Sequence, residues 1–290
     1  MYNQIDSNKR KSLALMIFFV LIIVGLVWAW AQYSESGYYM LIPATIFATS
    51  MSLVSFFAGD KIALATAGAK EIKKENNPYL WRIVENLSIT AGLAMPKVHI
   101  IEDAAMNAFA TGRDPNHSSI AVTTGLINGL TNEELEGVIA HELSHVKNYD
   151  IRLMMVVIVC VGIISLLADW MMRSFIFRGR GRDDNNRGGI LMIFGIVLAI
   201  LSPLFARLIQ MAVSRKREFL ADASGALLTR YPEGLARALE KISAQEIPLK
   251  RANKATAHLY ISSPFKGQSM SKLFSTHPPV EERIKALRTM

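Results

Sequence analysis

Residues 131–150 read T-N-E-E-L-E-G-V-I-A-H-E-L-S-H-V-K-N-Y-D, and this stretch predicts a helix with a well-marked beginning. Thr131 is a good N-cap residue, and Glu134 three positions later completes a capping-box pattern. The glutamates of the first turns suit the positive end of the helix dipole. Leu135 and Val138 follow at helical spacing, which indicates an apolar face turned toward a core.

The helix contains the motif H-E-L-S-H, which predicts a metal site. His141 and His145 are four residues apart, so both imidazoles project from one face and can reach one zinc ion at about 2.0–2.1 Å. Zinc lowers the pKa of a bound water toward about 7, and Glu142 is placed to take its proton. Chance would produce this spacing on the order of once in a hundred chains of this length. We therefore expect a zinc site with Glu142 as general base.

A catalytic zinc site typically has three protein ligands, so one ligand is still missing. The segment at 214–225, S-R-K-R-E-F-L-A-D-A-S-G, offers Glu218 and Asp222 on one face of an expected helix. We expect Glu218 to be the third ligand. Asp222 would accept a hydrogen bond from the outer nitrogen of one histidine and fix its orientation. Acidic residues at this spacing are common on solvated helix faces. The pair therefore indicates a metal site only in combination with the histidine motif.

Four apolar runs explain an unusual composition. The chain has 290 residues, of which 51% are hydrophobic and only 19% are charged, which is apolar for a soluble protein. The first run has nineteen uncharged residues, enough to cross about 30 Å of hydrocarbon. The net charge is +8, and the basic residues flank the apolar runs and do not form a patch interleaved with aromatic residues. We therefore expect a lipid bilayer as partner and no nucleic acid. The runs are residues 13–31, 38–58, 153–172 and 190–206.

The first two runs predict a transmembrane hairpin, because six residues separate them. The competing interpretation is a cleaved signal peptide, since A-W-A at 29–31 resembles a small-x-small cleavage site. The loop at 32–37 has no Lys or Arg, whereas lysines follow the second run. The positive-inside rule then places the N-terminus and the residues after 58 in the cytoplasm.

The third run directly follows the motif helix, and an Arg/Gly-rich tract at 178–189 separates it from the fourth. If both runs crossed the membrane, this basic tract would lie outside, against the positive-inside rule. The alternative is that both runs associate with the membrane without crossing it. In either arrangement the number of crossings is even, because Glu218 must return to the side of the two histidines.

The expected fold class is an α-helical integral membrane protein with a cytoplasmic α+β zincin-like metalloprotease domain, mainly helical with a small sheet. Asn77 and Pro78 predict the start of another helix, which Gly92 would close. Short strands are expected at 98–101, 107–111 and 119–124. The predicted organisation is an N-terminal transmembrane hairpin at 1–58, a first catalytic part with the motif helix at 59–152, a second apolar hairpin at 153–206 and a second catalytic part at 207–290.

Four motifs together resemble one known family. They are H-E-L-S-H-V-K-N-Y-D at 141–150, E-F-L-A-D at 218–222, N-A-F-A-T-G at 107–112 and S-T-H-P-P at 275–279. The combination resembles the HtpX-type membrane zinc metalloproteases, relatives of the CAAX prenyl endopeptidases and of soluble periplasmic peptidases. The resemblance extends over essentially the whole chain. It implies one Zn²⁺ per chain with His141, His145 and Glu218 as ligands, and Glu142 as general base.

The resemblance also implies a substrate-binding strand. Asn107 would contact the backbone of the substrate from a sheet edge, together with Ala108, Phe109 and Ala110. This role is chemically reasonable, because an extended peptide can add to an exposed strand as one more strand.

Further roles follow from the resemblance at two other positions. His277, within H-P-P, would help stabilise the oxyanion of the tetrahedral intermediate; its alternative role is to precede a helix that begins at Pro279. Asn148 and Asp150 match the family pattern and would brace the end of the motif helix.

The function implied is an endopeptidase that cleaves damaged membrane proteins at the cytoplasmic face of a bacterial inner membrane, in which the chain is multi-pass. One alternative is a processing protease of the CAAX type, a task that favours a larger chamber built from more spans. Another is a scaffold or chaperone with a structural zinc. Structural sites normally have four protein ligands, often cysteines, and Cys160 is the sole cysteine. Natural substrates and oligomeric state do not follow from these residues.

Overall fold

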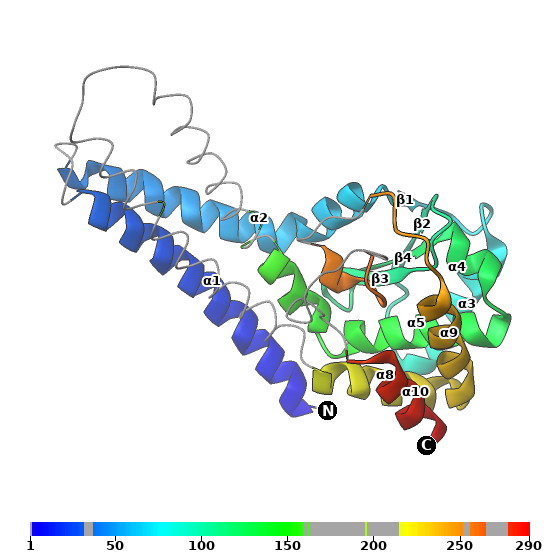
Figure 1. Cartoon of the computed structure of the whole chain (residues 1–290). Helices are drawn as coiled ribbons and strands as arrows, with labels where there is room; N and C mark the ends of the chain where they lie inside the picture. The colour runs from blue at the N-terminus through cyan, green and yellow to red at the C-terminus, as the bar shows by residue number, and fades with distance from the viewer. Residues whose placement is uncertain are drawn as a thin grey trace.

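The computed structural model describes residues 2–31, 37–158, 160, 162, 195, 215–251, 256–264 and 278–290. This part of the chain is mostly helical and contains a four-stranded mixed sheet. A long helical hairpin projects from a compact domain that holds the sheet and the remaining helices (Figure 1). The mainly helical α+β fold that the sequence predicts is therefore confirmed.

Helices α1 (Tyr2–Ala31) and α2 (Leu41–Ala67) form the hairpin, and a 3₁₀ turn, η1 (Gly37–Met40), precedes α2. The helix α2 continues beyond the predicted boundary at residue 58 and ends at Gly68, whose φ of +69° suits glycine. The two helices pack side by side in antiparallel directions (Figure 1).

One stretch in the part of the chain that the structure describes, Tyr38–Ala67, is long and apolar enough to cross a membrane by length and composition. Most of the third and fourth apolar runs, and the whole Arg/Gly tract between them, lie outside the described residues. The four membrane segments therefore stay a prediction.

The sheet has the strand order β1-β2-β4-β3, so β3 lies at an edge. Strands β2 and β4 are parallel, and the other two pairs are antiparallel. The hairpin between β3 and β4 turns at Asp114, whose carboxylate accepts hydrogen bonds from the backbone N–H groups of Asn116 and His117. The strands are β1 (Lys70–Glu71), β2 (Lys97–Ile101), β3 (Ala108–Asp114) and β4 (His117–Thr123).

Apolar side chains cover both faces of the sheet. Ala110 and Ile120 belong to one core cluster, which contains residues of the helices beneath the sheet. Their neighbours Phe109 and Ala121 point the other way, into a second cluster with the end of α2 and with Met154. This alternation follows from the two-residue period of a strand, and it explains why most consecutive residues of β3 and β4 are buried.

Further helical elements pack around the sheet. Asn77 caps α3 by accepting a hydrogen bond from the backbone N–H of Leu80, and Gly92 ends the helix, as the sequence predicts. Helix α5 runs along the sheet, and α8, α9 and α10 lie on the side of α5 that faces away from the sheet (Figure 1). The elements are α3 (Pro78–Ala91), α4 (Thr124–Gly129), α5 (Asn132–Lys147), α8 (Arg215–Thr229), α9 (Pro232–Ala244), η2 (Ala257–Leu259) and α10 (Val280–Arg288).

The capping box at the start of α5 is confirmed: Thr131 and Glu134 each accept a hydrogen bond from the backbone N–H of the other. The prediction of one continuous helix over residues 131–150 is wrong at the C-terminal end. Helix α5 stops at Lys147, and helical structure resumes at Asp150. The break lies at Tyr149, whose φ of +60° is incompatible with a right-handed helix.

Candidate metal centre

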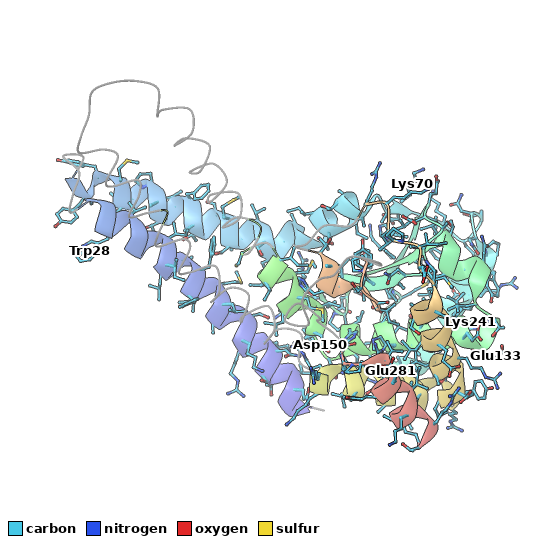
Figure 2. The ribbon with its side chains drawn as sticks, viewed as in Figure 1. Trp28, Lys70, Glu133, Asp150, Lys241 and Glu281 are labelled. Carbon is cyan, nitrogen blue, oxygen red and sulfur yellow. The ribbon has the colours of Figure 1, made fainter. Side chains whose placement is uncertain are left out.

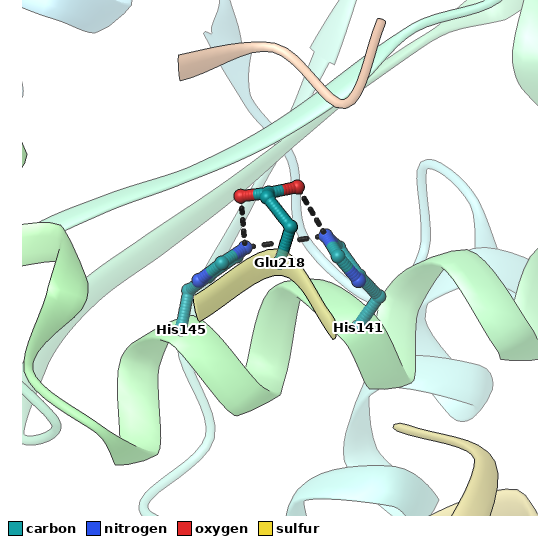
Figure 3. A group of neighbouring side chains, drawn as sticks. All are labelled: His141, His145 and Glu218. Atoms are coloured by element: carbon teal, nitrogen blue, oxygen red, sulfur yellow. Dashed lines mark hydrogen bonds and ion pairs between the residues drawn. The ribbon is translucent and has the colours of Figure 1, made fainter. Parts of the chain in front are cut away.

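His141, His145 and Glu218 converge on one point between α5 and α8 (Figure 3). The Nε2 atoms of the two histidines are 3.2 Å apart. The Glu218 carboxylate faces both rings, with Oε2 3.8 Å from His141 Nε2 and Oε1 3.6 Å from His145 Nε2. All three residues are buried, and one potential ligand atom from each lies within 4.8 Å of the others.

Each histidine is held at its other ring nitrogen by a buried carboxylate. His141 Nδ1 is 2.9 Å from Asp222 Oδ1, and His145 Nδ1 is 3.0 Å from Asp150 Oδ2. A carboxylate at Nδ1 fixes the ring orientation and leaves the Nε2 lone pair for a metal ion. Both imidazoles therefore present Nε2 toward Glu218, as Figure 3 shows.

Arg283 of α10 balances the negative charge behind the histidines. Its Nε and Nη2 donate hydrogen bonds of 2.8 and 2.6 Å to the Asp222 carboxylate, and its Nη1 is 3.6 Å from Glu218 Oε2. Burial alone would raise the pKa of Asp222, but Arg283 and His141 outweigh burial and lower the pKa to about 2. Asp222 is therefore ionised whenever the protein is folded near neutral pH.

At His145, burial and the neighbouring carboxylates shift the pKa in opposite directions. Burial by itself would lower the pKa of His145, but the hydrogen bond with Asp150 and the charge of Glu218 outweigh burial and raise the pKa to about 9. An imidazole must be neutral to bind a metal, so binding of a cation at this position releases a proton. The site therefore attracts positive charge, either as a proton or as a metal ion.

Glu142 lies beside the cluster and is 2% exposed. Burial raises the pKa of Glu142, and the nearby histidines and a hydrogen bond with the backbone of Ala110 oppose this effect. A raised pKa makes this carboxyl group a stronger base than a solvated glutamate, which suits a group that accepts a proton. The contact with Ala110 also places this carboxyl group at the outer edge of β3.

The outer edge of β3 is already hydrogen-bonded at its beginning, to the segment around residues 261–262. Asn107 Nδ2 donates to the backbone oxygen of Ser262 at 3.0 Å, and the backbone N–H of Ser262 lies 3.4 Å from Asn107 Oδ1. The backbone N–H of Ile261 donates to the oxygen of Ala108 at 3.0 Å. A substrate strand that used Asn107 and Ala108 would have to displace these contacts, whereas Ala110 meets Glu142 further along the edge. The substrate-binding role of Asn107, Ala108, Phe109 and Ala110 stays a prediction.

A close approach between α5 and α8 sets the distance between the ligands. A Cβ atom on Gly225 would lie 3.0 Å from the backbone nitrogen of His141. Gly225 lies seven residues after Glu218 and three after Asp222, on the same side of α8. The glycine thus lets the two backbones come near enough for both carboxylates to meet the histidines.

His277, the remaining predicted site residue, lies outside the described residues. The sequence did not predict that Asp150 and Arg283 contact the site. Asp150 was expected only to brace the end of the motif helix, and Arg283 had no predicted role. The signal for Arg283 was available, because it sits with Val280, Ile284 and Leu287 at the spacing of one buried helix face. A single charged residue on such a face indicates a buried partner.

The donor set of two imidazole nitrogens and one carboxylate oxygen suits zinc, and three protein ligands are typical of a catalytic site. The backing carboxylates also fit, since metal-bound histidines usually donate to such groups. The fold and this cluster together define a metallopeptidase of the kind that carries two ligands on one helix and a third on a later helix.

Comparison with known proteins agrees with this class. Residues 74–290 match the peptidase family M48. The chain belongs to peptidase family M48 and is a metalloprotease. It is 48% identical to the protease HtpX homologue of Dictyoglomus turgidum over 291 residues, which cover all of this chain and 94% of the relative. It is 43% identical to the homologue of Tropheryma whipplei over 290 residues, covering all of this chain and 98% of the relative.

The crystal structure of S. mikatae Ste24p has a similar fold. The similarity covers 99% of this chain and 67% of that chain, with a TM-score of 0.51 and 20% sequence identity. The likeness is therefore one of architecture.

Proposed function

We propose that this chain is a membrane-bound zinc endopeptidase that hydrolyses polypeptides with His141, His145 and Glu218 as zinc ligands. The observation that carries the proposal is the buried convergence of these three side chains beside Glu142. A bound zinc ion would polarise the scissile carbonyl and acidify the attacking water. The family membership supports a metal here, and the donor set favours zinc.

Glu142 would act as general base and then as general acid. Its burial raises the pKa of the carboxyl group, so its affinity for a proton is higher than that of a solvated glutamate. It would take the proton of the attacking water and deliver it to the leaving amine. Asp222 and Asp150 would keep the two imidazoles oriented, because each contacts the ring nitrogen that faces away from Glu218.

The substrate would bind as an extended strand beside β3. Support comes from the position of β3 at a sheet edge and from the contact of Ala110 with Glu142, which places the general base at that edge. Asn107 and Ala108 would contribute once the contacts with Ser262 and Ile261 open. His277 would serve as an oxyanion donor in this proposal, which rests on the resemblance of S-T-H-P-P alone.

The proposed setting is the inner membrane of a bacterium, with several crossings and the catalytic domain in the cytoplasm. The apolar stretch Tyr38–Ala67 supports membrane insertion. Trp28 lies toward the far end of the hairpin from the compact domain, where an interface anchor is useful (Figure 2). The beginning of α1 contacts the catalytic domain, so both lie on one side of any membrane that the hairpin crosses.

The proposed role is the quality control of damaged or misfolded membrane proteins, and its support is the likeness to the HtpX homologues. The alternative is a processing protease for prenylated peptides, and its support is the resemblance of the sequence motifs to relatives of the CAAX prenyl endopeptidases. A scaffold with structural zinc is disfavoured, because the proposed ligand set has three residues and Glu142 lies buried beside it.

The test uses the full chain, purified in detergent. Its zinc content is measured, and an unfolded protein such as casein is offered beside a prenylated peptide, with and without a chelator. We expect one zinc per chain and chelator-sensitive cleavage of casein. Cleavage of the prenylated peptide alone would favour the processing protease, and zinc without cleavage of either substrate would favour the scaffold.

A further inference from the structure

The first turns of α1 lie against the turn that follows α5, far away in sequence. Asn8 is 3% exposed, and its side-chain amide donates to Asp150 Oδ1 at 2.7 Å and to the backbone oxygen of Asn148 at 2.9 Å. These contacts bridge 142 and 140 positions. Asn148 is the C-cap of α5 and Asp150 begins the next helical stretch, so α1 contacts both sides of the break in the helix.

The same carboxylate continues the contact to the metal centre. Asp150 uses Oδ1 for Asn8 and Oδ2 for His145 Nδ1, which lies at 3.0 Å. One side chain therefore joins the membrane hairpin to a proposed zinc ligand through two direct hydrogen bonds. Arg217 Nε also lies 3.7 Å from Oδ1, and the hydrogen bond from Asn8 is the shorter contact of this oxygen. The carboxylate cannot rotate without weakening one of its hydrogen bonds, so the amide of Asn8 limits the orientations that the His145 ring can adopt.

The turn itself needs support from outside. Tyr149 has a φ of +60°, a conformation that bulky residues rarely adopt and that surrounding contacts must hold. Lys9, the residue after Asn8, places its Nζ 4.4 Å from the centre of the Tyr149 ring, and the guanidinium of Arg152 lies 5.0 Å from the same ring centre. Asn8 and Lys9 are successive residues of α1, and they contact the Asp150 carboxylate and the Tyr149 ring, respectively.

We propose that Asn8 is a positioning residue for the metal centre: its amide fixes Asp150, which orients His145 toward the metal ion. The inference rests on the proposed role of His145 as a ligand. It makes α1, the first helix of the proposed membrane hairpin, part of the structure that positions the metal ligands. Supporting groups behind metal ligands commonly change metal affinity by about 10- to 100-fold when they are lost.

The decisive variant is Asn8→Asp, which keeps the size of the side chain, removes the amide donor and places a second carboxyl group against Asp150. Zinc-loaded full chain in detergent is mixed with excess chelator, and the rate of zinc loss is followed. We expect about tenfold faster loss than from the wild type. The readout is independent of proteolysis: a wild type that binds zinc but cleaves no polypeptide would contradict the proposed function and leave this comparison intact.

The matched control is Ser12→Ala. Ser12 is buried on the same helix, and its hydroxyl donates to the backbone oxygen of Asn8, so the variant disturbs α1 without touching Asp150. We expect zinc loss at the wild-type rate. A rescue is available in the double variant Asn8→Asp with Asp150→Asn, which reverses the donor and the acceptor and keeps an amide oxygen for His145. Zinc retention should recover in part relative to Asn8→Asp.

Zinc loss at the wild-type rate from Asn8→Asp would overturn the proposal, as would equal acceleration in Asn8→Asp and Ser12→Ala without rescue by the double variant. If Asn8→Asp does not fold, Asn8→Ala takes its place, because it removes the amide without adding charge. Faster zinc loss from Asn8→Ala than from Ser12→Ala then supports the proposal, and equal rates overturn it.

Discussion

The guanidinium of Arg283 grips the carboxylate of Asp222 through two hydrogen bonds, of 2.8 and 2.6 Å, across 61 positions of sequence. Both side chains are almost completely buried. This pair ties α10 to α8 directly behind His141, so the last helix of the chain contributes to the charge balance of the metal centre.

Replacing Arg283 with Met should destabilise the fold strongly, because the variant leaves the carboxylates of Asp222 and Glu218 without their buried cation. We expect the free energy of unfolding to fall by about 3–5 kcal/mol. Chemical denaturation of the full chain in detergent measures the change. Arg288→Met is the matched control, since Arg288 is an exposed arginine of the same helix that pairs with Glu233. Equal losses in the two variants would contradict a special role for the buried pair.

Acid should weaken the fold through Asp222. Its pKa is about 2 in the folded chain, against 3.8 for an aspartate in water, so the stabilisation is fully present above pH 4 and is lost as pH falls toward 2. The contribution is about 2 kcal/mol. The free energy of unfolding of the wild type and of Asp222→Asn, measured from pH 6 to pH 2, should therefore converge at the acid end. A difference that stays constant over this range would argue against the buried ion pair.

Replacing Glu142 with Gln should remove cleavage and keep the metal. The amide cannot exchange a proton with water, and general acid–base catalysis is typically worth about 10²–10⁴-fold in rate. Casein cleavage and zinc content are measured on the same preparation. Glu136→Gln, on the same helix and hydrogen-bonded to Asn132, serves as the control and should cleave normally. Full activity in Glu142→Gln would rule out its role as general base.

A larger residue at Gly225 should loosen the metal site through the backbone. The Cβ atom would meet the backbone of His141 at 3.0 Å, so Val at this position pushes α8 away from α5 and carries Glu218 with it. We expect weaker zinc retention in Gly225→Val, measured against a chelator. Leu227→Val changes an exposed residue of the same helix to the same side chain and should retain zinc normally. Unaltered retention in Gly225→Val would show that α8 can shift without cost to the site.

Local signals in the sequence were sufficient for much of the fold. The caps at Thr131 and Asn77 depend on atoms within four residues, so sequence spacing alone predicts them. The spacing of His141 and His145 is likewise a property of one helix. Glu218 needed the histidine motif and the family resemblance as well, because an acidic pair on a helix carries little information by itself.

The contacts that cross the chain could not be predicted in this way. The break at Tyr149 has only the weak local signal of Asn148 and Asp150, since neither glycine nor proline marks it. The pairing of Asp150 with both Asn8 and His145 depends on where α1 lies against the domain, which is a matter of long-range packing. The strand β1, with two exposed residues, owes its existence to pairing with β2 and not to its own sequence.

In the proposed centre, one metal ion is held jointly by two histidines of α5 and a glutamate of α8. The most direct measurement is the zinc content of the purified full chain and of Glu218→Gln after equal exposure to a chelator. We predict about one zinc per wild-type chain and a large loss from the variant, because a neutral amide is a poor zinc ligand and withdraws one of three protein ligands. Equal retention of zinc in the two proteins would contradict the account.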